Sequence, residues 1–166
     1  ISIPGIDVTS GSLGHGVGYG AGLALHYLKK NIDKKVYVVI SEGELYEGST
    51  WEALLLAKHN SLKNLIVIID INNLIILGNT NDCLKLNPIE DKIKGLGIIP
   101  SIVDGHNIDE ILKTFNVEVT NNDFKCILAK TIKGKGASIM ESKANWHYMN
   151  SMSNEEITKT REELDN

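Results

Sequence analysis

Two short apolar runs, separated by a stretch with helical spacing, stand out in the middle of the chain. Residues 36–40 (VYVVI) and 65–69 (LIVII) are apolar and β-branched, which is typical of buried strands. Between them, residues 51–59 place apolar side chains at helical spacing, beginning with Trp51. A strand, a helix and a strand of this length form a crossover unit, so we expect the two strands to be parallel neighbours.

A polar turn follows each of these predicted strands. The turns are residues 41–44 (SEGE) and 70–73 (DINN). Carboxyl ends of neighbouring parallel strands meet at one edge of a sheet, where ligands bind in open α/β sheets. This topology would bring the carboxylate of Glu42 and the amide of Asn72 to the same crevice. Such oxygen donors suit Mg²⁺ or Ca²⁺ and are poor ligands for Zn²⁺.

Further segments continue the alternation of strands and helices. The pattern predicts an extended lead-in over 1–10, helices over 12–30, 88–96, 107–115 and 153–164, strands over 98–103 and 125–131, and a glycine-rich loop over 133–136. Ser49 or Thr50, with Glu52, is expected to cap the central helix, and Ser153 with Glu156 the last one. Such alternation predicts a doubly wound α/β domain with a mostly parallel sheet and helices on both faces.

The first predicted helix is unusually rich in glycine. Five glycines lie between Gly11 and Gly20, and each one inside a helix costs about 1 kcal/mol relative to alanine. One explanation is close packing of the helix against the sheet. The other is close approach of a ligand to the helix start, where backbone amides bind phosphate. The pattern alone leaves both explanations open.

Composition and charge narrow the class of protein. The chain has 166 residues, a hydrophobic content of 42% and a net charge of −4, which predict one ordinary globular domain over 1–166. The absence of a basic run argues against a nucleic-acid or membrane-surface partner. Two cysteines do not make a disulfide framework or a zinc site. No apolar run of membrane-spanning length and no secretory signal is visible, so the cytoplasm is the expected compartment.

Several motifs resemble those of transketolases, in particular the short N-terminal subunit of split, two-chain transketolases. The turns after the two central strands resemble the thiamine-diphosphate signature, in which Gly-Asp-Gly follows one strand and Asn ends the next. The matching segments are 4–16 (PGIDVTSGSLGHG), 42–48 (EGELYEG), 51–53 (WEA), 130–136 (KTIKGKG), 140–141 (ME) and 146–147 (WH). They cover nearly the whole chain in order. The chain begins inside a matching motif, so we expect an upstream segment to be missing from this sequence, and about 137–166 to form a C-terminal loop and helix.

The resemblance implies roles for individual residues. The metal ligands would be Glu42, Asn72 and the backbone carbonyl of Leu74. The cofactor would lie against Gly11, Ser12, Leu13, Ser41, Gly43, Asn72 and His147, and His147 would also touch the substrate. Glu47 would lie at a subunit interface and contact the partner's glutamate that activates the cofactor, so His147 and Glu47 are the expected catalytic residues.

Besides Asn73, which stands where the family often has Gly, the chain departs from the family pattern at three places. Glu42 stands where the family has Asp, Ser41 where it has Gly, and Leu77 where many transketolases have Asp. Glu keeps the charge but reaches one methylene further, and Mg²⁺ demands near-ideal octahedral geometry. The resemblance implies thiamine diphosphate and Mg²⁺ as cofactors, and the longer side chain of Glu42 makes Ca²⁺ or Mn²⁺ alternative metals.

The implied reaction is transfer of a two-carbon ketol unit from a ketose phosphate to an aldose. A partner subunit carrying the pyrimidine-binding domain would complete the site, and the pair would dimerise further. One alternative is another thiamine-diphosphate enzyme, such as a 1-deoxyxylulose-phosphate synthase or a 2-oxo acid dehydrogenase subunit, although the stretches 51–53, 133–136 and 146–147 fit transketolase better. The other is a non-catalytic or altered-specificity paralogue that keeps the fold, which the three departures favour.

Overall fold

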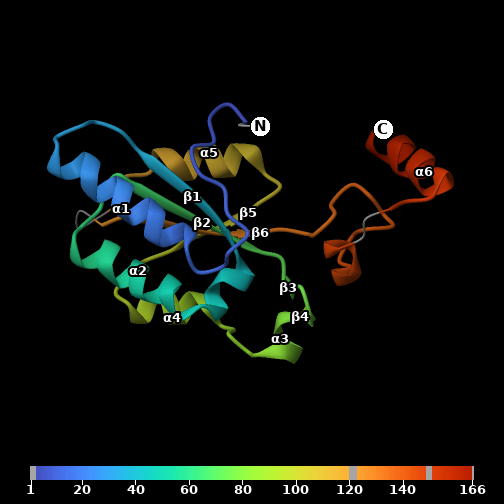
Figure 1. Ribbon diagram of the computed structural model, residues 1–166, viewed down its shortest axis with the longest axis horizontal. Helices are drawn as coiled ribbons and strands as arrows, with labels where there is room; N and C mark the ends of the chain where they lie inside the picture. Colours follow the sequence, from blue (N-terminus) through green and yellow to red (C-terminus); the bar gives the residue numbers. More distant parts are fainter. Residues whose placement is uncertain (1–2, 120–122, 149–150, 166) are drawn as a thin grey trace.

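The core of the molecule is a four-stranded, fully parallel sheet (Figure 1). The computed structural model describes residues 3–119, 123–148 and 151–165. The strand order is β1 (Val36–Ser41), β2 (Leu65–Ile71), β6 (Lys125–Lys130) and β5 (Ser101–Asp104). β1 and β2 pair in parallel with Val36 opposite Leu65, which confirms the predicted crossover unit.

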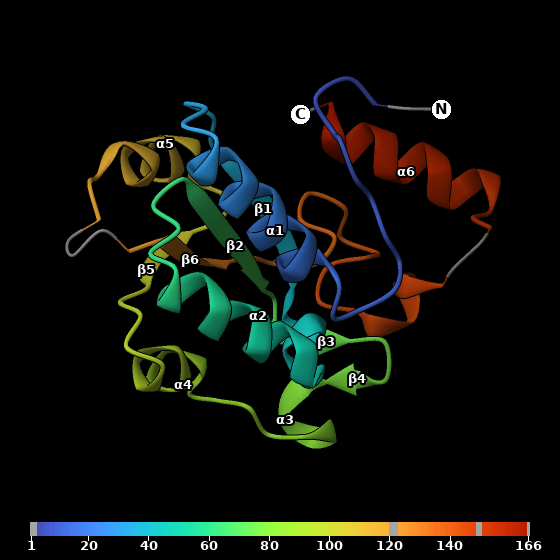
Figure 2. The ribbon, with the colours of Figure 1, turned by 60° about the vertical axis from the view of Figure 1, so that its left-hand side comes forward.

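Helices cover both faces of the sheet, which confirms the doubly wound α/β class (Figures 1 and 2). One face carries α1 (Gly16–Lys29), α2 (Gly48–His59) and α4 (Ile89–Gly95), and the other carries α5 (Ile108–Asn116). Alternate strand residues point to opposite faces. In β2, Val67 packs into the core under α1 and α2, whereas Ile66 packs into the core under α5. Burial on both faces explains why residues 65–69 of this strand are all apolar.

The edge strand β1 is covered on one face only. Val38 lies in the core under α1, whereas Tyr37 and Val39 are 51% and 71% exposed on the α5 side. The Tyr37 ring meets the Phe115 ring of α5 edge-on, with centroids 5.6 Å apart. An apolar strip is thus left along this edge of the sheet.

Several predicted boundaries shift in the structure. α1 begins at Gly16, so residues 12–15 of the predicted helix belong to the preceding loop. α2 begins at Gly48, and the predicted side-chain cap is wrong because the residue before it, Glu47, makes no capping hydrogen bond. Ser49 Oγ instead donates to the carbonyl of Gly14 at 2.8 Å. The hydroxyl expected to cap a helix locally is therefore used in a long-range contact.

The polar turns are more structured than the sequence indicates. Residues after β1 form a 3-10 helix, η1 (Glu42–Tyr46), and β2 runs on to Ile71. The apolar stretch that follows β2 makes a small hairpin of β3 (Leu74–Ile75) and β4 (Gly78–Asn79), which leads into the short helix α3 (Thr80–Cys83). The third predicted strand starts later than expected, at Ser101, directly after Pro100, which has no N–H for the ladder.

The C-terminal part leaves the sheet after β6. It forms a 3-10 helix, η3 (Ala144–His147), and then α6 (Asn154–Leu164), which lies apart from the sheet in both views (Figures 1 and 2). The predicted capping box of α6 is confirmed, with Ser153 and Glu156 bonding each other's backbone N–H. In the described part of the chain no helix is long and apolar enough to cross a membrane.

Candidate functional site

The carboxylate of Glu42 is the centre of the carboxyl edge of the sheet. Glu42 is the first residue of η1 and is fully buried, at 0% exposure. Its Oε2 accepts a hydrogen bond of 2.9 Å from the N–H of Asn73, so the turns after β1 and β2 meet directly. Its Oε1 is buried without a hydrogen-bond partner among the described residues. A buried carboxylate oxygen in that condition is costly unless a cation or donor reaches it.

The electrostatic surroundings of Glu42 also disfavour an ionised carboxylate that has no cation beside it. Desolvation by burial raises the pKa of its carboxyl above the usual value, and the negative charge of Asp70 adds to the rise. The hydrogen bond from the N–H of Asn73 and the nearby hydroxyl of Thr80 lower this pKa but do not cancel the rise. The ionised form is therefore under-stabilised by the protein alone, and a bound cation would supply the missing stabilisation.

Asn72 forms a tight turn of its own beside Glu42. Its Oδ1 accepts from the N–H of Leu74 at 3.0 Å, and its Nδ2 donates to Oδ2 of Asp70 at 3.1 Å. These two bonds set which end of the amide is oxygen. An amide oxygen has a second lone pair, so Oδ1 can still serve a metal ion.

Asp70 and Thr131 belong to this site, although no role was predicted for them from the sequence. Oδ1 of Asp70 bonds Oγ1 of Thr131, and the N–H of Thr131 donates to the carbonyl of Ile71 at 3.1 Å. The structure places Asp70 in β2, but the polar turn predicted over 70–73 contains it together with Asn72, and that is the signal that could have found it. Thr131 could not be placed from sequence, because β6 lies beside β2 only through the order of strands in the sheet.

The hairpin after Asn72 lies against η1, the 3-10 helix that carries the buried glutamate. The N–H of Thr80 donates to the carbonyl of Asn73 at 3.0 Å, and the hydroxyl of Tyr46 donates to the carbonyl of Thr80 at 3.1 Å. Thr80 itself is buried. These two bonds hold η1 and the segment that follows the hairpin together beside Glu42.

Close packing explains some of the glycines near the start of α1 but not others. A Cβ on Gly20 would collide with Cγ2 of Val38, and one on Gly16 would lie 3.3 Å from Cγ2 of Ile40. Close packing against the sheet accounts for these two. Gly11 has no atom within 4 Å of such a Cβ, so packing does not account for it. Its neighbours in the loop, Ser12 and Leu13, are exposed.

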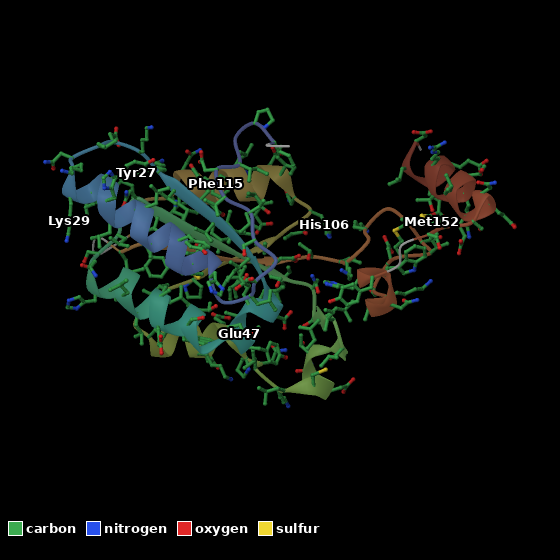
Figure 3. All side chains as sticks on the ribbon, viewed as in Figure 1. Tyr27, Lys29, Glu47, His106, Phe115 and Met152 are labelled. Atoms are coloured by element: carbon green, nitrogen blue, oxygen red, sulfur yellow. The ribbon has the colours of Figure 1, made fainter. Side chains whose placement is uncertain are left out.

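The other expected site residues lie around this edge in different environments. Ser41 ends β1 with an exposed side chain, and a Cβ on the half-buried Gly43 would lie 3.3 Å from its Oγ. Glu47 is exposed at the start of α2 (Figure 3). Leu74 opens β3 and is partly buried. The structure therefore gathers Ser41, Gly43 and Leu74 near Glu42 and leaves Glu47 facing solvent.

His147 sits further out than the residues around Glu42. It ends η3, which lies beside β4, and it is exposed, with its ring edge-on to Tyr148 at 4.8 Å between centroids. Among the described residues no hydrogen bond joins His147 to Glu42, Asn72 or the glycine loop. A different histidine contacts the segment between β6 and η3: Nε2 of His106 (labelled in Figure 3) accepts a hydrogen bond of 2.8 Å from the N–H of Ile132.

The donor set fits a hard divalent cation. A carboxylate oxygen, an amide oxygen and a backbone carbonyl are the ligand types that Mg²⁺ and Ca²⁺ take. No group of three or more His, Cys, Asp or Glu side chains that could hold a metal occurs in the described ranges, so a thiolate or imidazole site of the zinc type is not present there. Fold and site together define a parallel α/β domain whose carboxyl edge presents oxygen donors suited to a divalent cation.

The sequence matches one family along its length. Residues 1–165 match the family described as transketolase, thiamine diphosphate binding domain, and the chain belongs to this family. The expected resemblance and its thiamine-diphosphate-binding fold are thereby confirmed.

Curated relatives include proteins that are named as transketolase subunits. The chain is 37% identical over 149 residues to a subunit of the apulose-4-phosphate transketolase of Phocaeicola vulgatus, a match covering 89% of this chain and 53% of that protein. It is 39% identical over 146 residues to the 6-deoxy-6-sulfo-D-fructose transketolase subunit SqwG of a Clostridium species, covering 87% and 53%. The chain thus spans about half the length of these curated relatives.

Solved structures agree with this assignment. The transketolase of Campylobacter jejuni superposes with a TM-score of 0.87 at 28% identity, over 97% of this chain and 26% of that one. The transketolase of Leishmania mexicana gives a TM-score of 0.73 at 26% identity, over 98% and 29%.

Proposed function

We propose that this chain is the cofactor-binding half of a two-chain transketolase. The pair would transfer a two-carbon ketol unit from a ketose phosphate to an aldose. The observation that carries the proposal is the fully buried Glu42, whose Oε2 is held by the turn of Asn72 and Asn73 while Oε1 has no partner among the described residues. In a thiamine diphosphate binding domain, that position fits a metal ligand.

Different residues of the site would bind the metal and the different parts of the cofactor. Glu42, Asn72 and the carbonyl of Leu74 would hold Mg²⁺, or Ca²⁺ or Mn²⁺ in view of the longer glutamate. Gly11, Ser12 and Leu13 would flank the rings of the cofactor, and Ser41 and Gly43 would lie against its diphosphate. Thiamine diphosphate, when bound, supplies stabilisation of the carbanion.

His147 would act from the outer side of the same edge. Its ring N–H can donate to a phosphate oxygen or to the oxygen of the donor ketose on which charge develops. The contact of η3 with β4 supports this role, because β4 belongs to the hairpin that follows Asn72.

A second chain would complete the site. The relatives that are named as transketolase subunits support a partner that carries the pyrimidine-binding domain, and we expect the pair to dimerise further. Glu47, exposed at the start of α2, would contact the partner's activating glutamate. Sugar phosphates are the proposed substrates.

One observation favours a second candidate. Glu42 and Ser41 replace the Asp and Gly expected of a working site, and the Ser41 side chain occupies space close to Gly43. A paralogue that keeps the fold and binds the partner, without catalysis or with altered specificity, would carry such changes.

Calorimetric titration of the co-purified pair with thiamine diphosphate separates the two candidates. The titration is run with Mg²⁺, Ca²⁺ or Mn²⁺ and with a chelator, and repeated with Glu42→Gln, which removes the charge at nearly constant size. Saturable binding that needs a metal and Glu42, with ketol transfer in a coupled assay, supports the enzyme. Absence of binding with every metal refutes it and favours the paralogue.

A further inference from the structure

In the described part of the chain, the loop before α1 makes its long-range hydrogen bonds through Gly14 alone. The N–H of Gly14 donates to Oε2 of Glu44, and its carbonyl accepts from Oγ of Ser49 at 2.8 Å. Glu44 comes from η1 and Ser49 from the first turn of α2. Both polar groups of one peptide residue are therefore held by side chains that lie 30 and 35 positions away in sequence.

The geometry at Gly14 leaves no room for a side chain. Gly14 has φ +84°, a conformation that favours glycine. A Cβ there would lie 2.8 Å from Cβ of Glu47 and closer still to Oγ of Ser49. The start of α2 is thus pressed against the backbone of the loop.

The remainder of the loop has only local support in the described part of the chain. Gly11, Ser12 and Leu13 are exposed. The N–H of Ser12 bonds Oγ of Ser10, and the carbonyls of Ser12 and Leu13 lie near Nδ1 of His15. The position of the loop relative to Glu42 therefore depends on Gly14.

We propose that Glu44 and Ser49 are positioning residues that clamp Gly14 and so fix the loop Gly11–Leu13 against the metal site. Glu44 is 8% exposed, and a buried carboxylate needs donors such as this N–H. The inference rests on the proposed function, in which the cofactor lies along that loop. A loop that is already ordered loses less conformational entropy when the cofactor binds, so the clamp favours binding.

Amide hydrogen exchange of the full chain without cofactor tests the clamp directly. Ser49→Ala removes the exposed hydroxyl, and Glu44→Ala removes the buried acceptor. We expect exchange over residues 11–14 to rise about tenfold, the effect of ~1.4 kcal/mol, while β2 and β6 keep their protection. Ser49→Thr and Glu44→Gln retain an oxygen at each position and should restore slow exchange. Glu52→Gln, on the exposed side of α2, is the matched control.

A second measurement links the clamp to the cofactor. In the assembled pair with Mg²⁺, Ser49→Ala should weaken thiamine diphosphate binding about tenfold, with unchanged thermal unfolding and with recovery in Ser49→Thr. Unchanged exchange over 11–14 in Ser49→Ala overturns the clamp, and this holds even if Glu44→Ala fails to fold. Failure of the wild-type pair to bind the cofactor would overturn the proposed function and leave the exchange test to decide the clamp.

Discussion

At the scale of single residues, Glu42 departs from the family pattern and is also a fully buried carboxylate with one unpartnered oxygen among the described residues. The side chain is one methylene longer than the expected aspartate, yet it is fully buried. Its Oε2 is already occupied by the N–H of Asn73, which leaves Oε1 for a cation. The hairpin after β2 lies against η1, the 3-10 helix that carries this side chain.

Shortening this side chain tests its role as a ligand. Glu42→Asp should tighten Mg²⁺-dependent binding of thiamine diphosphate, because the family geometry is restored, and should remove any advantage of Ca²⁺ or Mn²⁺. Titrations of the assembled pair with each metal measure this, with Glu52→Asp as the control. Identical binding by Glu42→Asp and wild type with every metal would exclude Glu42 as a ligand.

His147 offers a second test at this scale. If its N–H stabilises developing charge on the substrate, His147→Ala should lower turnover by about a hundredfold to a thousandfold. Thermal unfolding and partner binding should not change, because the side chain is exposed. His59→Ala, an exposed histidine at the end of α2, is the control. Equal steady-state rates for His147→Ala and wild type would remove this residue from the site.

At the scale of elements, α5 depends on a lysine from the neighbouring strand. Nζ of Lys125 in β6 donates to the carbonyls of Thr114, Phe115 and Val117 at 2.7, 2.8 and 2.6 Å. These groups lie at the C-terminal end of α5, where helix carbonyls lack partners within the helix. A cation there also interacts favourably with the helix dipole.

Removal of this lysine should loosen α5. Lys125→Met keeps the length and apolar stem but removes a charged donor from three partly buried carbonyls, which should lower the free energy of unfolding by ~1–3 kcal/mol. Urea denaturation measures the loss, and Lys113→Met on the exposed side of α5 should have little effect. Equal stability of Lys125→Met and wild type would show that the capping bonds are energetically neutral.

The attachment of α6 should depend on pH. The carboxylate of Glu163 accepts from the N–H and Oγ of Ser138 at 2.7 and 2.5 Å, and these bonds lower the pKa of Glu163 below its usual value. Because the folded pKa is depressed, the contact is fully present above the ordinary glutamate pKa of about 4.3. It should be lost as the pH falls through the lowered value.

The protection factor of the Ser138 amide, in which the intrinsic pH dependence of exchange is divided out, follows this contact as the pH is lowered. Glu163→Gln should abolish the pH dependence, whereas Glu155→Gln, in the first turn of the same helix, should retain it. A wild-type profile that stays flat through the titration of Glu163 would contradict the assignment.

At the scale of the whole molecule, large apolar side chains remain exposed on neighbouring helices and on β1. Tyr19 of α1 and Leu55 of α2 are 54% and 49% exposed, and α1 packs against α2. Glu47 is exposed at the start of α2. We therefore expect a pyrimidine-domain partner to cover the outer side of α1 and α2.

Mixing the two chains should give a heteromeric species in sizing experiments with light scattering. Leu55→Glu should weaken that association, because it places a charge in an apolar interface. Ile99→Glu, at an exposed position of the α4–β5 loop, is the matched control. A monomer that remains separate from its partner at high concentration would count against the two-chain enzyme.

Local pattern was sufficient for much of this architecture. The runs at 36–40 and 65–69 are short and β-branched, so burial and strand formation follow from their composition. The crossover rule then makes the strands parallel and brings Glu42 and the turn of Asn72 to one edge. The capping box of α6 was also readable, because all its partners lie within four residues.

Only the tertiary structure decided which distant groups meet. β6 lies between β2 and β5, and this order brings Thr131 to Asp70. Ser49 had the spacing of a helix cap, but its hydroxyl bonds the carbonyl of Gly14 instead. Local sequence determines which conformations a segment prefers. A polar side chain such as that of Ser49 can reach several hydrogen-bond partners, and the packed fold decides which of them still needs a bond.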